Sequence, residues 1–318
     1  GIFLWVVFAE AVGQCLGSFF NGCGRTKIPA LSYAIAIPLN VAISYSLIHG
    51  HYGLPELGVA GAAVGSVVAS LARVLFLVFI FVRLTGGYRG TTGWRNGTLG
   101  KSIRRHFLFA LPIAGTFSSN VAANYVSTLL FAKMSVNAFA AMTVIQPWVM
   151  LTGQVGIAWA MATGIAVAQL LGQDRRGTEL TTFLRRVWRG ALGAAGLVSL
   201  AFLAFNLSIE RIYTELEAET ITALLSFLPI LLILPFPKGS NAMCGHTLRA
   251  GGDTLYVMNI FVSAQWLFRV PLTVLFILVL DLSVTWVFAL FLAEELFKFP
   301  LFHRRLLKGK WKDGLAAD

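Results

Sequence analysis

Nine runs of mostly apolar residues, each roughly 20 residues or more in length, dominate this sequence. An α-helix rises about 1.5 Å per residue, so about 20 residues cross the roughly 30 Å of hydrocarbon in a bilayer. A helix also satisfies its own backbone hydrogen bonds, which the bilayer interior cannot do. The sequence therefore predicts an all-α polytopic membrane protein. The predicted spans cover about residues 1–21, 28–49, 58–83, 106–131, 138–171, 187–208, 220–246, 255–280 and 283–303.

The composition excludes a single water-soluble domain. Hydrophobic residues make up 57% of the chain and charged residues 12%, with a mean hydropathy of +0.76, whereas a soluble domain carries about a quarter charged residues. The connections between the runs are short and rich in glycine and proline, as in residues 50–55. The three cysteines have neither disulfide context nor zinc-ligand spacing. We therefore expect no metal site and no cofactor.

Basic residues are distributed unevenly over the connections. If the first run ends in the cytoplasm, the external loops hold only Lys133 and Arg211, and Arg73, Lys238 and Arg269 lie inside predicted spans. The other 20 of the 25 lysines and arginines then lie on the cytoplasmic side, which is a positive-inside pattern. The net charge of +11 is accordingly interpreted as topology and attraction to anionic lipid headgroups, rather than as nucleic-acid binding.

A weak internal repeat divides the chain. Residues 24–26 (Gly-Arg-Thr) follow the first run, and residues 252–254 (Gly-Asp-Thr) precede the last two runs, 228 residues later. Membrane proteins often contain such duplicated units. We therefore expect residues 1–83 to superpose on residues 229–303, helix for helix, about a pseudo-two-fold axis.

Several longer motifs, in a fixed order over essentially the whole chain, are similar to those of multidrug and toxic compound extrusion (MATE) transporters. Residues 24–29 (Gly-Arg-Thr-Lys-Ile-Pro), 38–40 (Pro-Leu-Asn) and 53–63 (Gly-Leu-Pro-Glu-Leu-Gly-Val-Ala-Gly-Ala-Ala) resemble the fourth to sixth helices of that family. The other matching segments are Leu111-Pro112, residues 156–158 and 168–173, residues 252–254, residues 269–272 and Lys310-Trp311.

The resemblance implies a two-lobe transporter with 6+6 helices, of which about three N-terminal helices are absent here. The expected organisation is a partial N-terminal lobe (1–83), a cytoplasmic linker (84–105), a C-terminal six-helix lobe (106–303) and a basic cytoplasmic tail (304–318). The implied function is efflux of organic compounds, often cationic and amphipathic, in exchange for protons or sodium by alternating access. The implied partners are membrane lipids and small organic substrates, without nucleic acid. The full-length protein would be a monomer of the bacterial inner membrane, and not an enzyme.

Apart from the basic residues assigned to the cytoplasmic ends of the spans, we consider six ionisable residues within predicted spans, where each charge costs at least about 2.5–3.5 kcal/mol. Glu10 and Lys238 each lie fourteen residues before the repeated glycine motif, so an acid and a base occupy equivalent places. We expect one intramembrane ion pair in each lobe, Glu10 with Arg73 and Lys238 with Glu294 or Glu295. Such pairs either hold helices together or exchange protons during transport. The six residues are Glu10, Arg73, Lys238, Arg269, Glu294 and Glu295.

Polar side chains on the predicted spans of the C-terminal lobe indicate a substrate cavity. Three prolines, Pro229, Pro235 and Pro237, interrupt the run 220–246 just before Lys238, and broken helices in transporters tend to line the substrate site. For any one of these residues, the alternative is a hydrogen bond between helices. The candidate cavity residues are Asn120, Asn124, Gln146, Trp148, Gln154, Trp159, Lys238 and Asn241.

The positions of the acids depart from part of the MATE family. Some branches carry a cation-binding acid on the seventh helix, but residues 106–131 contain no Asp or Glu, and neither do residues 220–246. Another branch carries its coupling acid on the first helix, which is outside this chain. The coupling ion is therefore proton or sodium, with proton coupling favoured.

Three other functions stay open. A lipid-linked oligosaccharide flippase of the same superfamily would present a cationic cavity to pyrophosphate, as Lys238 and Arg269 allow. A membrane enzyme such as a prenyl transferase needs paired acids on a loop to hold magnesium, and the cytoplasmic loops offer only Asp174, Glu179 and Asp253. A membrane scaffold without transport activity is the third.

Overall fold

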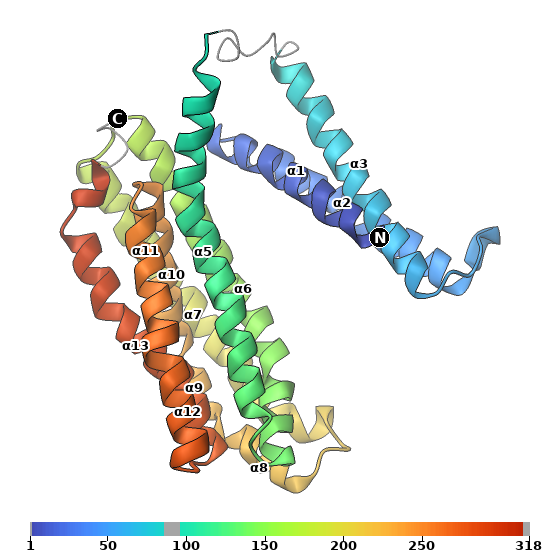
Figure 1. The fold of residues 1–318 in the computed structure, drawn as a ribbon, viewed down its shortest axis with the longest axis vertical. Coiled ribbons are helices and arrows are strands. Elements are labelled where there is room, and N and C mark those ends of the chain that lie inside the picture. The colour runs from blue at the N-terminus through green and yellow to red at the C-terminus, as the bar shows by residue number, and fades with distance from the viewer. Residues whose placement is uncertain (1, 86–95, 314–318) are drawn as a thin grey trace. The chain divides into compact units, whose positions relative to one another are not determined.

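The computed structural model describes residues 2–85 and 96–313 and divides into two compact units, residues 1–98 and 99–318. All regular structure in these described ranges is helical (Figure 1), which confirms the all-α fold. Six helices there are long and apolar enough to cross a membrane, or seven if a bent pair counts as one span. The two remaining predicted spans also form helices, α5 and α13, but both carry polar side chains that lower their hydropathy.

The first unit consists of three long helices, α1 (Ile2–Gly22), α2 (Lys27–His49) and α3 (Val59–Thr85), with a short turn η1 (His51–Gly53) between the last two. The α2 and α3 backbones approach closely because α3 presents glycines to α2. A Cβ on Gly61 would lie 2.7 Å from the Leu47 carbonyl carbon. Small residues at helix interfaces permit this packing in membrane proteins, where apolar burial alone does not bring helices together.

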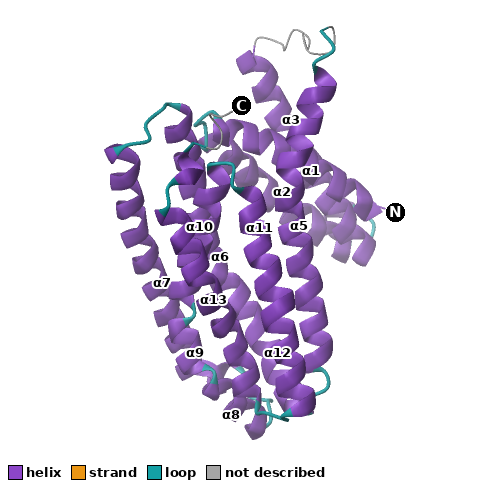
Figure 2. Ribbon diagram, turned by 60° about the vertical axis from the view of Figure 1, so that its left-hand side comes forward, coloured by secondary structure: helices purple, strands orange, loops and turns teal. Residues whose placement is uncertain are grey.

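The second unit begins with three long helices, α5 (Leu99–Phe131), α6 (Val136–Gly172) and α7 (Thr178–Ile212). A broken segment follows, made of α8 (Ala218–Ser226), α9 (Leu228–Ile233) and α10 (Pro235–Ala250). Next come α11 (Thr254–Ser263), a π-helical turn η2 (Ala264–Arg269), α12 (Val270–Val274) and a second π-helical turn η3 (Leu275–Val279). The unit ends with α13 (Val284–Leu307) and η4 (Lys310–Lys312), and its long helices run alongside one another (Figure 2).

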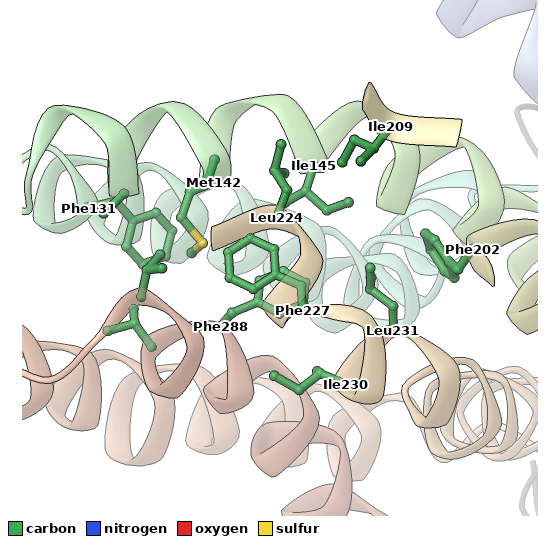
Figure 3. Packing of buried hydrophobic residues seen from close by; sticks show 14 of the residues in the cluster. Phe131, Met142, Ile145, Phe202, Ile209, Leu224, Phe227, Ile230, Leu231 and Phe288 are labelled. Atoms are coloured by element: carbon green, nitrogen blue, oxygen red, sulfur yellow. The ribbon is translucent and has the colours of Figure 1, made fainter. Parts of the chain in front are cut away.

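Two clusters of buried apolar side chains occupy the two ends of this second unit. In the first, Phe227 and Phe288 stack with ring centroids 4.2 Å apart, and Phe131, Met142 and Leu224 surround them (Figure 3). The second cluster, toward the opposite end of the same helices, contains Val167, Leu171, Leu180, Leu248, Val257, Phe302 and Trp311. The charged residues of this second unit that are discussed below lie in the layer between these clusters.

The broken segment bends sharply in this middle layer. The helices Ala218–Ile233 and Pro235–Ala250 meet at an angle of 47°. Proline has no backbone N–H and clashes with the preceding turn, so Pro235 and Pro237 account for the bend. The Ser199 hydroxyl on α7 donates to the Leu232 carbonyl at 2.8 Å, which satisfies an acceptor at the break.

Several helices extend beyond the apolar runs from which they were predicted. The expected linker 84–105 lies partly outside the described residues, and its last part, from Leu99, is the first two turns of α5. Likewise α7 begins at Thr178 rather than near 187. Within the expected tail 304–318, Trp311 is 2% exposed and packs against Gly251. Hydrophobicity marks only the part of a helix in hydrocarbon, whereas Lys, Arg and Glu continue the helix into the polar layer.

Candidate functional site

In the first unit, Arg73 on α3 forms an ion pair with Glu10 on α1, as the sequence predicted. The Arg73 side chain is 1% exposed, whereas that of Glu10 is 40% exposed. Ser70 donates a hydrogen bond of 3.0 Å to the second Glu10 oxygen. The Arg73 guanidinium also lies 3.8 Å from the centroid of the Tyr33 ring, so the buried cation has both a carboxylate and an aromatic face as partners.

In the second unit, two acids and two bases form a buried charge network of Arg269, Glu294, Glu295 and Lys298. Glu294 accepts from Arg269 on η2 and from Lys298 one turn further along α13, each at 3.0 Å. Glu295 accepts from the same Lys298 at 2.8 Å. These four side chains are between 3% and 12% exposed. The network is neutral overall, which lowers the cost of keeping its charges out of water.

Three asparagines extend the charge network to neighbouring helices. Arg269 donates to Asn124 Oδ1 at 3.0 Å, and Asn124 in turn donates to Asn120 on the same helix, α5, at 2.9 Å. On the other side, Asn241 of α10 donates from Nδ2 to Glu295 Oε2 at 2.8 Å. Hydrogen bonds therefore connect α5, η2, α13 and α10 through one polar layer.

The predicted pair of Lys238 with Glu294 or Glu295 is not formed as a direct contact. In the described part of the chain, no carboxylate oxygen lies within 4.0 Å of Lys238 Nζ. Both oxygens of each glutamate are occupied, three of the four by Arg269 or Lys298 and the fourth by Asn241. The charge pattern of the sequence places Lys298 among the cytoplasmic basic residues. Its spacing of three and four residues from the glutamates is the sequence signal that identifies it as their partner.

Lys238 instead lines a cavity of about 40 Å³ between α6, α7 and the α9–α10 break. We call this the Lys238 cavity. Most of its wall is apolar, with Val149, Ile157, Val198 and Phe202 among the lining residues. A Cβ on Gly153 would lie 3.4 Å from Lys238 Nζ, so the missing side chain at that position leaves space beside the ammonium group.

The other predicted cavity residues are distributed over several environments. Trp159 lines the Lys238 cavity, with its indole Nε1 donating to the Val187 carbonyl at 3.0 Å. Trp148 donates to the Tyr213 hydroxyl at 3.1 Å, close to the first apolar cluster. The two glutamines, Gln146 and Gln154, are half-buried and exposed respectively, and neither lines the cavity. Asn120, Asn124 and Asn241 belong with the charge network.

The described residues contain no group of three or more His, Cys, Asp and Glu side chains that could hold a metal ion. Ion pairs and hydrogen bonds inside the chain already use the buried acids. The second unit can therefore offer two different polar features to a ligand or ion: a neutral charge network shared by four helices, and an unpaired cation in an apolar cavity.

Comparison with known proteins identifies relatives of the whole chain. The MatE family model matches residues 112–275. An uncharacterised transporter of Bacillus subtilis, YisQ, is 24% identical over 322 residues, covering 99% of this chain and 70% of YisQ. A protein of Rhizobium meliloti described as a "probable multidrug resistance protein NorM" is 24% identical over 281 residues. That match covers 82% of this chain but 57% of the relative, so the chain spans little more than half the length of this NorM.

Solved structures with the same fold are transporters. The MATE transporter VcmN of Vibrio cholerae, in its bent form, aligns with a TM-score of 0.78 and 17% identity, covering 97% of this chain and 70% of VcmN. A MOP superfamily transporter from Pyrococcus furiosus aligns with a TM-score of 0.81 and 17% identity, covering 97% and 69% of the two chains. Because the family model matches more than half of its residues, the chain belongs to the MatE family of multidrug and toxic compound extrusion transporters.

Proposed function

We propose that this protein exports amphipathic organic compounds across the bacterial inner membrane in exchange for a coupling cation. The observation that carries the proposal is the position of the Lys238 cavity beside a buried charge network, with Lys238 and Asn241 less than one helical turn apart on α10. A helix that both lines a cavity and contacts buried acids can link substrate binding to the charge state of those acids. Membership of the MatE family supports export as the direction of transport.

Within the network, Glu295 is the acid that can take up a proton at the lower cost. If Glu295 is neutralised, Lys298 keeps its ion pair with Glu294, and Arg269 keeps the same carboxylate. If Glu294 is neutralised, Arg269 loses its carboxylate and retains only the neutral amide of Asn124 among these partners. A buried cation without a counter-ion costs several kcal/mol. We therefore assign proton exchange to Glu295, with a structural role for Glu294.

Sodium is the second candidate for the coupling ion. Asn241 Oδ1 is buried and has no hydrogen-bond partner, while Asn241 Nδ2 donates a hydrogen bond to the Glu295 carboxylate. Amide and carboxylate oxygens are ligands that hard cations prefer. A sodium ion bound at these oxygens would neutralise Glu295 as a proton does. Transport driven by an imposed sodium gradient, with no proton gradient, would distinguish the two ions.

Accumulation of fluorescent compounds in cells tests export. The full-length protein is expressed in bacteria that lack their own drug efflux pumps, and two probes of opposite charge are supplied, the cation ethidium and the anion carboxyfluorescein. We expect lower accumulation of at least one probe than in cells with an empty vector, and restored accumulation when ion gradients are collapsed. The Glu295→Gln variant should lose export, whereas the surface variant Glu179→Gln should keep it. Equal accumulation of both probes with and without the protein would contradict the proposal.

A further inference from the structure

Lys238 stands out as a cation inside the helical unit with no carboxylate in direct contact. Among the described residues it makes no ion pair within 4.0 Å, and the carboxylates nearest in the fold are occupied by Lys298, Arg269 and Asn241. Together with the neutral charge network, Lys238 gives these five charged side chains a net charge of +1. An unpaired charge at membrane depth is costly, and it attracts an anion in a low-dielectric surrounding.

The surroundings of Lys238 fit one part of a ligand in particular. The cavity has a volume of about 40 Å³, whereas one water molecule needs about 10–15 Å³. The space therefore accommodates a group of a few heavy atoms, such as a carboxylate, sulfonate or phosphate. Other polar groups on the wall already have partners, since Thr152 donates to the Trp148 carbonyl and Trp159 donates to Val187. The ammonium of Lys238 is therefore the polar group available to a ligand.

We propose that the Lys238 cavity binds the anionic group of an amphipathic organic anion, with the Lys238 ammonium as its counter-ion. Gly153 leaves room for that group beside Nζ, and Val149, Ile157 and Phe202 provide apolar contact for the adjoining hydrocarbon. The proposal rests on the export function above and specifies the charge of the compounds that this cavity accepts. A soluble amphipathic anion and an anionic lipid headgroup share this chemistry.

Equilibrium binding to the intact protein in nanodiscs of phosphatidylcholine tests the proposal. The probes are 1-naphthalenesulfonate and (1-naphthylmethyl)trimethylammonium, which share a ring system and carry permanent opposite charges. We expect the unmodified protein to bind the sulfonate more tightly than the ammonium compound. In the Lys238→Met variant, sulfonate affinity should fall by about 10- to 100-fold, the range of one hydrogen bond to a charged group, whereas Lys238→Arg should retain most of it.

Two controls separate the cavity from general effects of charge and folding. Lys133→Met makes the same substitution at an exposed lysine, and should leave sulfonate affinity unchanged. If Lys238→Met does not fold, the preference of the unmodified protein for the sulfonate over the ammonium compound still decides the question. Equal affinity for the two probes, or unchanged sulfonate affinity in a folded Lys238→Met protein, would overturn the proposal.

The source of the anion is decided by adding phosphatidylglycerol to the nanodiscs. If lipid headgroups occupy the cavity, phosphatidylglycerol should weaken sulfonate binding to the unmodified protein but not to Lys238→Met, and the anion is then a lipid. If it has no effect while the sulfonate still binds through Lys238, the anion is a soluble compound. Export of ethidium without sulfonate binding would refute the anion site and leave the proposed export function intact.

Discussion

Glu294 accepts ion pairs from two cations, Arg269 and Lys298, and all three side chains are at most 6% exposed. Replacing it by glutamine keeps the shape but removes the negative charge, so Arg269 loses its carboxylate and Lys298 retains only Glu295. Breaking a buried ion pair by removing one partner costs about 3–5 kcal/mol. We expect Glu294→Gln to lower the free energy of unfolding by that amount, measured by chemical denaturation in detergent.

The matched control for this substitution is Glu179→Gln. Glu179 pairs with Arg175 on the surface, and both side chains are more than half exposed, so its loss should cost about 1 kcal/mol or less. Similar destabilisation by the two substitutions would show that the buried network does not contribute more than a surface pair.

At the residue scale, charge cost and repeat position predicted which ionisable side chains lie inside the helical units better than they predicted the partners of those side chains. The Glu10–Arg73 pair was found because each residue has one opposite charge on a neighbouring helix. The direct contacts predicted for Lys238 are made instead by Lys298 on α13, which reaches the same glutamates at 2.8 and 3.0 Å. A partner on the same helix need not extend a long side chain across a helix interface. Lys298 was not predicted as this partner because it lies near the end of the predicted span.

The α2–α3 interface depends on glycine at the level of whole helices. A Cβ on Gly61 would lie 2.7 Å from backbone atoms of Leu47, and a backbone cannot move aside as a flexible side chain can. Gly61→Ala should therefore separate the two helices and destabilise the protein by about 1–3 kcal/mol. Thermal unfolding of the purified protein measures the effect.

Gly193 on α7 provides the control, because a Cβ there would meet no atom within 4 Å. Gly193→Ala should be neutral or stabilising by up to about 1 kcal/mol, since alanine favours the helix. Destabilisation by Gly193→Ala equal to that by Gly61→Ala would mean that loss of glycine, rather than helix contact, causes the effect.

At the element scale, the apolar runs predicted every long helix because roughly 20 apolar residues have few alternatives in a bilayer. They predicted the ends less well. The first turns of α5 and α7, from Leu99 and Thr178, are polar or amphipathic. Hydropathy did not predict the π-helical turn that carries Arg269. One extra residue in a turn rotates the following helix without changing the composition of the run.

Orientation is a property of the whole molecule and stays a prediction from the charges. In a background without Cys15, Cys23 and Cys244, a membrane-impermeant thiol reagent added outside intact cells should modify Glu215→Cys but not Thr98→Cys. The physical reason is that loops rich in lysine and arginine stay on the cytoplasmic side of the membrane. Modification of Thr98→Cys alone would reverse the assigned topology.

The two units also differ in the detail of their buried charges. The first holds Arg73 and Glu10 with Ser70 as a further donor, whereas the second holds a network of four charges and the unpaired Lys238. The expected superposition of the backbone of residues 1–83 on that of residues 229–303 stays a prediction. If it holds, equivalent positions carry a helix-pairing ion pair in the first unit and the proposed ion-coupling network in the second.

Transport by the intact protein in sealed liposomes tests proton-coupled export through Glu295 most directly. With an acidic interior and no sodium gradient, we predict that 1-naphthalenesulfonate added outside accumulates inside as protons leave. Glu295→Gln should abolish the dependence on the pH gradient while the protein remains folded, and Glu179→Gln should transport as the unmodified protein does. Two results would contradict this assignment. One is accumulation by Glu295→Gln that still follows the pH gradient. The other is that the unmodified protein shows gradient-driven uptake of neither the sulfonate nor (1-naphthylmethyl)trimethylammonium.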